Sequence, residues 1–159
     1  MLNVKRTNIF EIKEAIAVAF DKDEVGLKKY KDPINLMPVL TIADSVEDTV
    51  LKLKEYVAAE KAMIYFKVME DEVLIGFFAC YWDYKGSIYC LVSFGINKNY
   101  RLKNYMNEYF NLLKKTMLNR FYISLWSVNT RAIKWLKKNG LEECASRDYK
   151  GHNVTTLII

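Results

Sequence analysis

Residues 129–141 read NTRAIKWLKKNGL, and this stretch carries the most specific pattern in the chain. Asn129 is a residue type that caps the start of helices, and Gly140 is the type that ends them in the left-handed conformation. Between them, three apolar residues recur at helical spacing and are expected to face inward: Ala132, Ile133 and Leu136. Apolar, strand-like runs precede and follow the stretch. The pattern therefore predicts a short helix between two strands.

Upstream of this stretch, the apolar pattern first has the period of a strand and then that of a helix. Residues 62–69, 73–82 and 87–96 are three β-rich runs with short polar connections, which favours consecutive antiparallel strands. A long helix is predicted from Arg101, and residues 121–126 are expected to form a further strand. The apolar face expected for the long helix consists of Leu102, Tyr105, Met106, Tyr109, Phe110, Leu113 and Met117.

The first 60 residues predict one strand and two helices. Residues 2–7 form the strand-like run. Asn8 and Asp44 are each followed three residues later by Glu, which is a pattern typical of a helix start, and apolar residues at helical spacing follow each. Both prolines fall within residues 31–40, which are expected to form an irregular loop between the two helices.

The C-terminal part predicts two strands, at residues 141–146 and 154–159, joined by a polar turn at 147–153. The complete order is β-α-α-β-β-β-α-β-α-β-β, which indicates an α/β fold. The chain has 159 residues and no linker rich in Gly, Pro or Ser. Residues 1–159 are therefore expected to form a single domain.

Composition narrows the classes of ligand and partner. The chain has 24 Lys and Arg against 19 Asp and Glu, a net charge of +5, with both signs interspersed. This balance fits an anionic ligand and does not indicate nucleic acid. The sequence shows no signal peptide and no apolar stretch long enough to span a membrane. A cytoplasmic protein without membrane contact is therefore expected.

Three cysteines are present, Cys80, Cys90 and Cys144, and none of them forms a Cys-x-x-Cys pair. The one histidine, His152, adds little as a second ligand, so no metal site is expected. Cys80 and Cys90 lie in apolar strand-like runs, where a thiol usually acts as a small core residue. This usage indicates a reducing compartment.

The element order and the stretch 129–141 resemble the GCN5-related N-acetyltransferases, whose closing helix motif has an Asn, then Ala-Ile, then a basic end before Gly. Residues 92–101, VSFGINKNYR, are similar to the family's fourth strand running into its pyrophosphate loop. The resemblance covers essentially the whole chain and is weakest over the first 60 residues. It implies a mixed, mostly antiparallel central sheet with helices on both faces.

The resemblance also implies acetyl-CoA as the cofactor and a defined place for it. In the family, the fourth and fifth strands splay apart, so the backbone of one can hydrogen-bond the pantetheine as another strand would. The pyrophosphate lies at the positive start of the helix that follows. The cofactor-binding residues that this implies are Val92, Phe94, Ile96, Arg101, Lys103, Asn104, Tyr105 and Asn129.

Three positions depart from the family's pattern. The pyrophosphate loop of the family reads Arg/Gln-x-x-Gly-x-Gly/Ala, whereas Asn104 and Met106 occupy the two small positions here. Glycine matters there because it lets the backbone approach the phosphates closely. Many members carry a Tyr as general acid, and the aligned residue here is Leu136. No general base is evident, since Asp83 fits a turn residue better, and the catalytic residues stay unassigned.

Two functions fit these features. The first is an enzyme that transfers an acetyl group from acetyl-CoA to the amine of a small molecule or a peptide. The second is a catalytically degenerate relative that serves as a binding or assembly module with a protein partner. One example of such a module is a phage virion or accessory protein, which would be located in the host cytoplasm or the virion. The intact order of strand, loop and helix favours the enzyme, whereas the altered positions favour the module.

Overall fold

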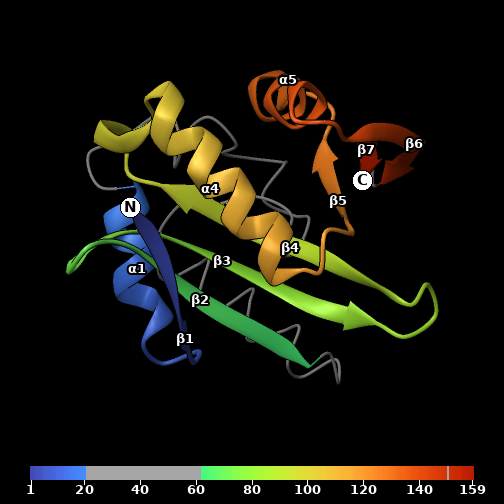
Figure 1. Ribbon diagram of the computed structural model, residues 1–159. Helices are drawn as coiled ribbons and strands as arrows, with labels where there is room; N and C mark the ends of the chain where they lie inside the picture. Colours follow the sequence, from blue (N-terminus) through green and yellow to red (C-terminus); the bar gives the residue numbers. More distant parts are fainter. Residues whose placement is uncertain (21–61, 150) are drawn as a thin grey trace.

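The computed structural model describes residues 1–20, 62–149 and 151–159, and its strands form one seven-stranded sheet (Figure 1). The strands are β1 Leu2–Thr7, β2 Met63–Glu70, β3 Val73–Asp83, β4 Ile88–Ile96, β5 Phe121–Trp126, β6 Glu142–Tyr149 and β7 His152–Ile158. Their order across the sheet is β1-β2-β3-β4-β5-β7-β6. All neighbours are antiparallel except β4 and β5, which run parallel. The predicted mixed, mostly antiparallel sheet is confirmed.

Helices cover both faces of the sheet, as expected. The described helices are α1 Ile12–Phe20, α4 Lys103–Thr116 and α5 Thr130–Lys138, with a short 3₁₀ helix, η2, at Lys98–Tyr100. The first, α1, packs on one face against a buried cluster that includes Phe77, Tyr81 and Val92. On the other face, α4 and α5 pack against a second cluster that includes Phe78 (Figure 1). Phe77 and Phe78 belong to different clusters because successive residues of a strand point to opposite faces of the sheet.

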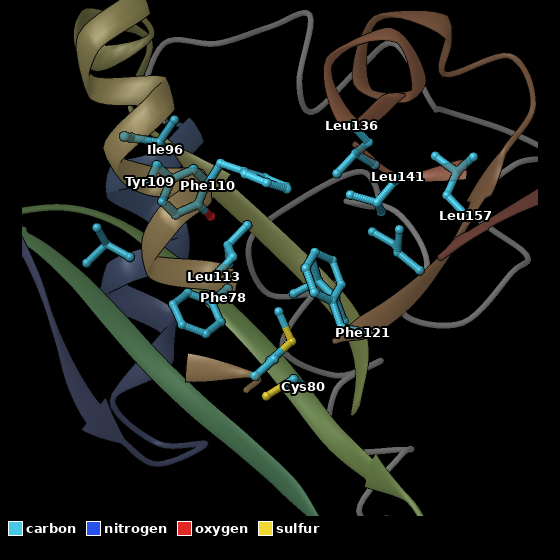
Figure 2. Packing of buried hydrophobic residues seen from close by; sticks show 14 of the residues in the cluster. Phe78, Cys80, Ile96, Tyr109, Phe110, Leu113, Phe121, Leu136, Leu141 and Leu157 are labelled. Carbon is cyan, nitrogen blue, oxygen red and sulfur yellow. The ribbon is translucent and has the colours of Figure 1, made fainter. Parts of the chain in front are cut away.

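The second cluster, the main core, lies between the sheet and helices α4 and α5 (Figure 2). Tyr109 and Leu113 of α4 are completely buried in it, and so is Leu136 of α5. The four-residue spacing of Tyr109 and Leu113 places both on one side of α4, which is the amphipathic arrangement that the sequence predicts. Burial of this stripe fixes α4 across β3 and β4.

The start of α1 and the end of α5 agree with the capping residues in the sequence. The Asn8 Oδ1 atom accepts hydrogen bonds from the N–H groups of Phe10 and Glu11, each at 3.0 Å. The Glu11 carboxylate accepts a further bond from the Thr7 hydroxyl at 2.9 Å. At the other end of the sequence, Gly140 has φ +101° directly after α5, as predicted for a left-handed helix end.

Two sequence expectations about the elements are wrong. Leu102 is 64% exposed, because α4 begins at Lys103 and Leu102 is its N-cap residue with extended backbone. The polar turn expected at 147–153 is mostly strand, since β6 and β7 pair as far as Tyr149 and His152. The polar residues are tolerated because β6 is an edge strand open to water. The second helix and the loop expected at 31–40 lie outside the described residues.

Strands β3 and β4 approach each other closely near the end of β4. The Tyr109 hydroxyl donates to the Phe77 carbonyl at 2.7 Å and accepts from the Gly95 N–H at 3.1 Å. Phe77 and Gly95 are cross-strand partners, so a hydroxyl from α4 is inserted into the ladder between them. At the neighbouring position, a Cβ atom on Gly76 would lie 2.5 Å from the Gly95 carbonyl oxygen, so this approach requires glycine.

Candidate functional site

Strands β4 and β5 pair only at their starts. The two cross-strand pairs are Tyr89 with Phe121 and Cys90 with Tyr122, and we call the second pair the branch point. Beyond it β5 turns away from β4, as Figure 1 shows, and the described residues provide no partner strand for that side of β4. We call this the open side of β4. The splayed strands expected from the sequence resemblance are present.

A β-bulge in β4 accompanies the branch point. Cys80 pairs with Leu91 and Ala79 pairs with Ser93, so Val92 is an extra residue on β4. A bulge bends its strand and increases the local twist. The bulge therefore helps to turn β4 away from β5, directly beyond their last shared pair.

The backbone of β4 alternates between its two sides beyond the bulge. The Asn97 N–H donates to the Ile75 carbonyl at 2.7 Å, and the Gly95 N–H also points toward β3. Phe94 and Ile96 alternate with these residues and turn their backbone groups to the open side. The Ile96 carbonyl accepts a hydrogen bond from the Arg101 Nε atom at 2.9 Å. Val92, Phe94 and Ile96 thus lie along the strand where the sequence predicted contacts to pantetheine.

Within the described residues, no side chain caps the start of α4. Leu102 provides no side-chain hydrogen bond, and the first turn contains no acidic residue. For the N–H groups of Lys103, Asn104 and Tyr105, the described part of the chain offers no acceptor. Such groups carry the positive end of the helix dipole, so they suit an anion.

The two replaced small residues of the loop are accommodated differently. Asn104 is exposed and does not have a positive φ, so its own backbone conformation does not demand glycine. Met106 is partly buried and packs against the main core. Its side chain therefore contributes to the attachment of α4, at a position where the family has Gly or Ala.

The loop before α4 is fastened to the end of α1. The Asn97 Nδ2 atom donates to the Val18 carbonyl at 2.7 Å, and the Arg101 Nη2 atom donates to the Ala19 carbonyl at 3.4 Å. These carbonyls belong to the last turn of α1, where a cation is favourable. The structure therefore places Arg101 in the expected loop, with its guanidinium directed toward α1 and β4.

Two other predicted residues use their side chains in contacts within the fold. The Tyr105 ring packs edge-on against Tyr100, with centroids 5.2 Å apart. The negative charge of Glu70 on β2 raises the pKa of Tyr105, which indicates that this ring faces the β1–β2 side. The Asn129 Oδ1 atom accepts from the Ala132 N–H at 3.4 Å. Asn129 therefore caps α5, as expected from its residue type.

Trp135 of α5, to which the sequence assigned no role, contacts both α4 and β4. Trp135 of α5 stacks on Phe94 of β4 with centroids 5.8 Å apart, and meets the edge of Phe110 of α4 at 5.6 Å. It therefore packs beside the open side of β4. The neighbouring Leu136, aligned with the family's acid Tyr, is completely buried in the main core and cannot donate a proton.

A chain of polar side chains at the branch point was also missed. The Tyr122 hydroxyl donates to the Asp83 Oδ2 atom at 2.9 Å, and the Tyr81 and Tyr122 hydroxyls are 3.3 Å apart. Asp83 is the last residue of β3, and its Oδ1 atom accepts from the Lys85 N–H at 3.1 Å in the turn that follows. Alternation along β3 places Tyr81 on the α1 face with Phe77 and Ala79, but its partner on β5 depends on cross-strand register.

Two classes of feature are not found in the described residues. Across 1–20, 62–149 and 151–159, no helix combines the length and apolarity needed to cross a membrane. Over the same ranges, no three His, Cys, Asp or Glu side chains gather in a group that could hold a metal ion.

Comparison with known proteins adds a family and a set of similar folds. The sequence model of the acetyltransferase (GNAT) family matches residues 36–141, about two-thirds of the chain. No curated protein matches the sequence. An aminoglycoside acetyltransferase solved in complex with coenzyme A is 11% identical, with a TM-score of 0.70 over 100% of this chain and 94% of that one.

Two further solved structures have the same fold at similar identity. An acetyl transferase from Salmonella typhimurium that modifies the N-terminal serine of a 50S ribosomal subunit protein is 10% identical, with a TM-score of 0.65 over 99% of this chain and 94% of that one. The spermidine/spermine N-acetyltransferase of Vibrio cholerae is 14% identical, with a TM-score of 0.57 over 100% of this chain and 94% of that one. At these identities the likeness shows a shared fold.

Proposed function

The chain belongs to the GNAT acetyltransferase family, and on this premise we propose that it transfers the acetyl group of acetyl-CoA to the amine of a small molecule or a peptide. The family relation supports acetyl transfer as the general reaction. The similar structures named above include an N-acetyltransferase of polyamines and an enzyme that modifies an N-terminal serine. These relatives support an amine as the class of acceptor.

One observation carries the proposal. The open side of β4 leads directly into the uncapped start of α4, within the span from Val92 to Tyr105. In the proposed complex, the pyrophosphate would accept from the N–H groups of Lys103, Asn104 and Tyr105. The pantetheine would then run along β4 as an added strand, bonded by the backbone of Val92 and Phe94. The acetyl group would reach the branch point.

The remaining predicted residues take supporting roles in this proposal. Lys103 is exposed in the first turn of α4 and adds a positive charge beside the pyrophosphate. Arg101 holds the Ile96 carbonyl and so fixes the loop that presents α4. Asn129 fixes the start of α5, from which Trp135 borders the open side.

Calorimetry with acetyl-CoA tests the proposal directly. We expect a dissociation constant between micromolar and millimolar, and we expect Lys103→Glu to weaken binding about tenfold by placing a like charge at the pyrophosphate. Lys138→Glu is the matched control, since Lys138 is an exposed lysine at the opposite end of another helix, and it should leave the affinity unchanged.

A thiol-release assay with a panel of polyamines and peptides then tests turnover. The proposal predicts thiol release from acetyl-CoA that depends on the added amine. No heat and no thermal shift at millimolar acetyl-CoA would overturn the proposal. That result would favour the alternative of a binding or assembly module, which would then be expected to co-purify with a protein partner.

A further inference from the structure

Three residues of adjacent strands lie side by side at the branch point. Tyr81 of β3 pairs with Cys90 of β4, and Cys90 pairs with Tyr122 of β5. Tyr81 and Cys90 belong to the buried cluster on the α1 face, and Tyr122 packs against that cluster. The two phenols therefore lie on the face opposite to the main core, at the last pair before β4 and β5 separate.

The hydrogen bonds of these phenols have a direction. Tyr122 donates its single hydroxyl proton to the Asp83 Oδ2 atom. Tyr122 can therefore only accept in its 3.3 Å contact with Tyr81, and Tyr81 is the donor. The chain of bonds runs outward from Tyr81, which is 8% exposed, through Tyr122 to the half-buried carboxylate of Asp83 at the end of β3.

Both phenols keep their protons in this environment. Burial raises the pKa of Tyr81 to about 12. Burial also raises the pKa of Tyr122. Neither phenol is therefore a base by itself, and Asp83 is the proton acceptor at the end of the chain. A neutral phenol can pass a proton by accepting one at its oxygen while it releases its own.

Building on the proposed function, we propose that Tyr81, Tyr122 and Asp83 form a proton relay that removes the proton of the acceptor amine. The amine attacks the acetyl carbonyl, and a C–N bond forms as the carbonyl π electrons move onto the oxygen, from which they return when the C–S bond breaks. The nitrogen passes its proton to the Tyr81 oxygen, Tyr81 passes its own to Tyr122, and Tyr122 passes its own to Asp83. The C–S bond then breaks and the thiolate takes a proton from solvent. Asp83 returns its proton to solvent at the end of β3.

The relay supplies a base where the sequence alone offers none. Its inner end lies next to Cys90 and the bulge at Val92, where the acetyl group of the proposed complex would lie. Its outer end is fixed by the turn after β3, since the Asp83 Oδ1 atom accepts from the Lys85 N–H. Asp83 is thereby held with its Oδ2 atom toward Tyr122.

The experiment uses the whole chain, acetyl-CoA and a primary amine that the wild type acetylates. Tyr81→Phe, Tyr122→Phe and Asp83→Asn should each lower kcat by ~10²-fold or more while the affinity for acetyl-CoA stays within about twofold, since acid–base assistance contributes ~10²–10⁴-fold. Because the relay acts as a unit, the double variant Tyr81→Phe/Tyr122→Phe should be no slower than the slower single variant. Tyr89→Phe is the matched control, since Tyr89 is a half-buried tyrosine beside Cys90 that packs against the main core.

Solvent isotope effects separate a relay from a merely structural role. In mixtures of H₂O and D₂O, the rate of the wild type should depend on the deuterium fraction with curvature, because several protons move together. For Tyr122→Phe, the rate should depend linearly on the deuterium fraction. A wild type that turns over while Tyr122→Phe keeps its rate would overturn the relay alone, and so would a slower Tyr122→Phe with unchanged curvature. A wild type without turnover would overturn both the relay and the proposed function.

Discussion

The two sides of β4 are built differently. Toward β3, the strand is paired along its whole length, and the Tyr109 hydroxyl of α4 is inserted into that ladder. Toward β5, pairing ends at the branch point, and the backbone of Phe94 faces no strand among the residues that the structure describes. The paired side uses its polar groups for the fold, so they are unavailable to a ligand. The open side keeps its groups available because the opposite side, together with α4, holds the strand in place.

The largest effect on stability is expected from Tyr109 on the paired side. Tyr109→Ala removes a completely buried ring and should lower the free energy of unfolding by about 3–5 kcal/mol. Tyr109→Phe keeps the ring but leaves the Gly95 N–H and the Phe77 carbonyl without the hydroxyl, at a cost of about 1–3 kcal/mol. Urea denaturation measures both. A Tyr109→Phe variant as stable as the wild type would show that the hydroxyl does not hold the two strands.

The next effect concerns the close approach of β3 and β4. Gly76→Ala places a methyl group 2.5 Å from the Gly95 carbonyl oxygen and should cost about 1–3 kcal/mol. Gly86→Ala is the control, because there the added atom first meets the side chain of Ile88 at 3.0 Å rather than backbone. Thermal unfolding of the two variants gives the comparison. Equal losses would argue against a tight β3–β4 contact.

On the open side, Trp135 should matter less for stability and more for the ligand. Trp135→Ala removes a partly buried ring and should cost about 1–2 kcal/mol, less than a completely buried aromatic residue. Since the ring stacks on Phe94, its loss should also change the dissociation constant for acetyl-CoA measured by calorimetry. A stability loss as large as that of Tyr109→Ala would mean that the open side also carries the fold.

The smallest effect is expected at Asn104. Asn104→Gly in the exposed first turn of α4 should cost at most about 0.5–1 kcal/mol, because glycine lowers helix propensity without disturbing packing. It also restores a glycine of the family's pyrophosphate loop, so the affinity for acetyl-CoA should rise. Calorimetry on this variant and on Asn107→Gly, an exposed site one turn further along α4, separates the two effects. An equal rise in both would exclude a specific role of position 104.

The helices and strands could be predicted well because each depends mainly on residues that are close together in the sequence. The helical spacing of Tyr109 and Leu113 and the left-handed Gly140 each depend on neighbours within a few residues. Leu102 was misplaced because spacing alone does not show at which residue a helix begins. The splay of β4 and β5 was expected through a family resemblance, since no pattern in the chain indicates where pairing stops.

The chemistry at the branch point could not be predicted in the same way. The Tyr81 and Tyr122 hydroxyls meet across 41 residues of sequence, and their meeting depends on the register of three strands and on the bulge at Val92. Trp135 was not assigned to the main core because its contacts are with Phe94 and Phe110, on other elements. Strand register and tertiary packing depend on residues that are far apart in the sequence, whereas periodicity can be seen among neighbouring residues.

The position of β7 has a consequence for how the chain is made. This strand follows β6 in the sequence but lies between β5 and β6 in the sheet. A ribosome therefore releases β5 and β6 before the strand that both must pair with. Until residues 152–158 emerge, β5 presents an unpaired edge and β6 has no place in the sheet. Each newly synthesised molecule thus passes through a state with an exposed edge, and in that state the edge of β5 can capture another nascent chain.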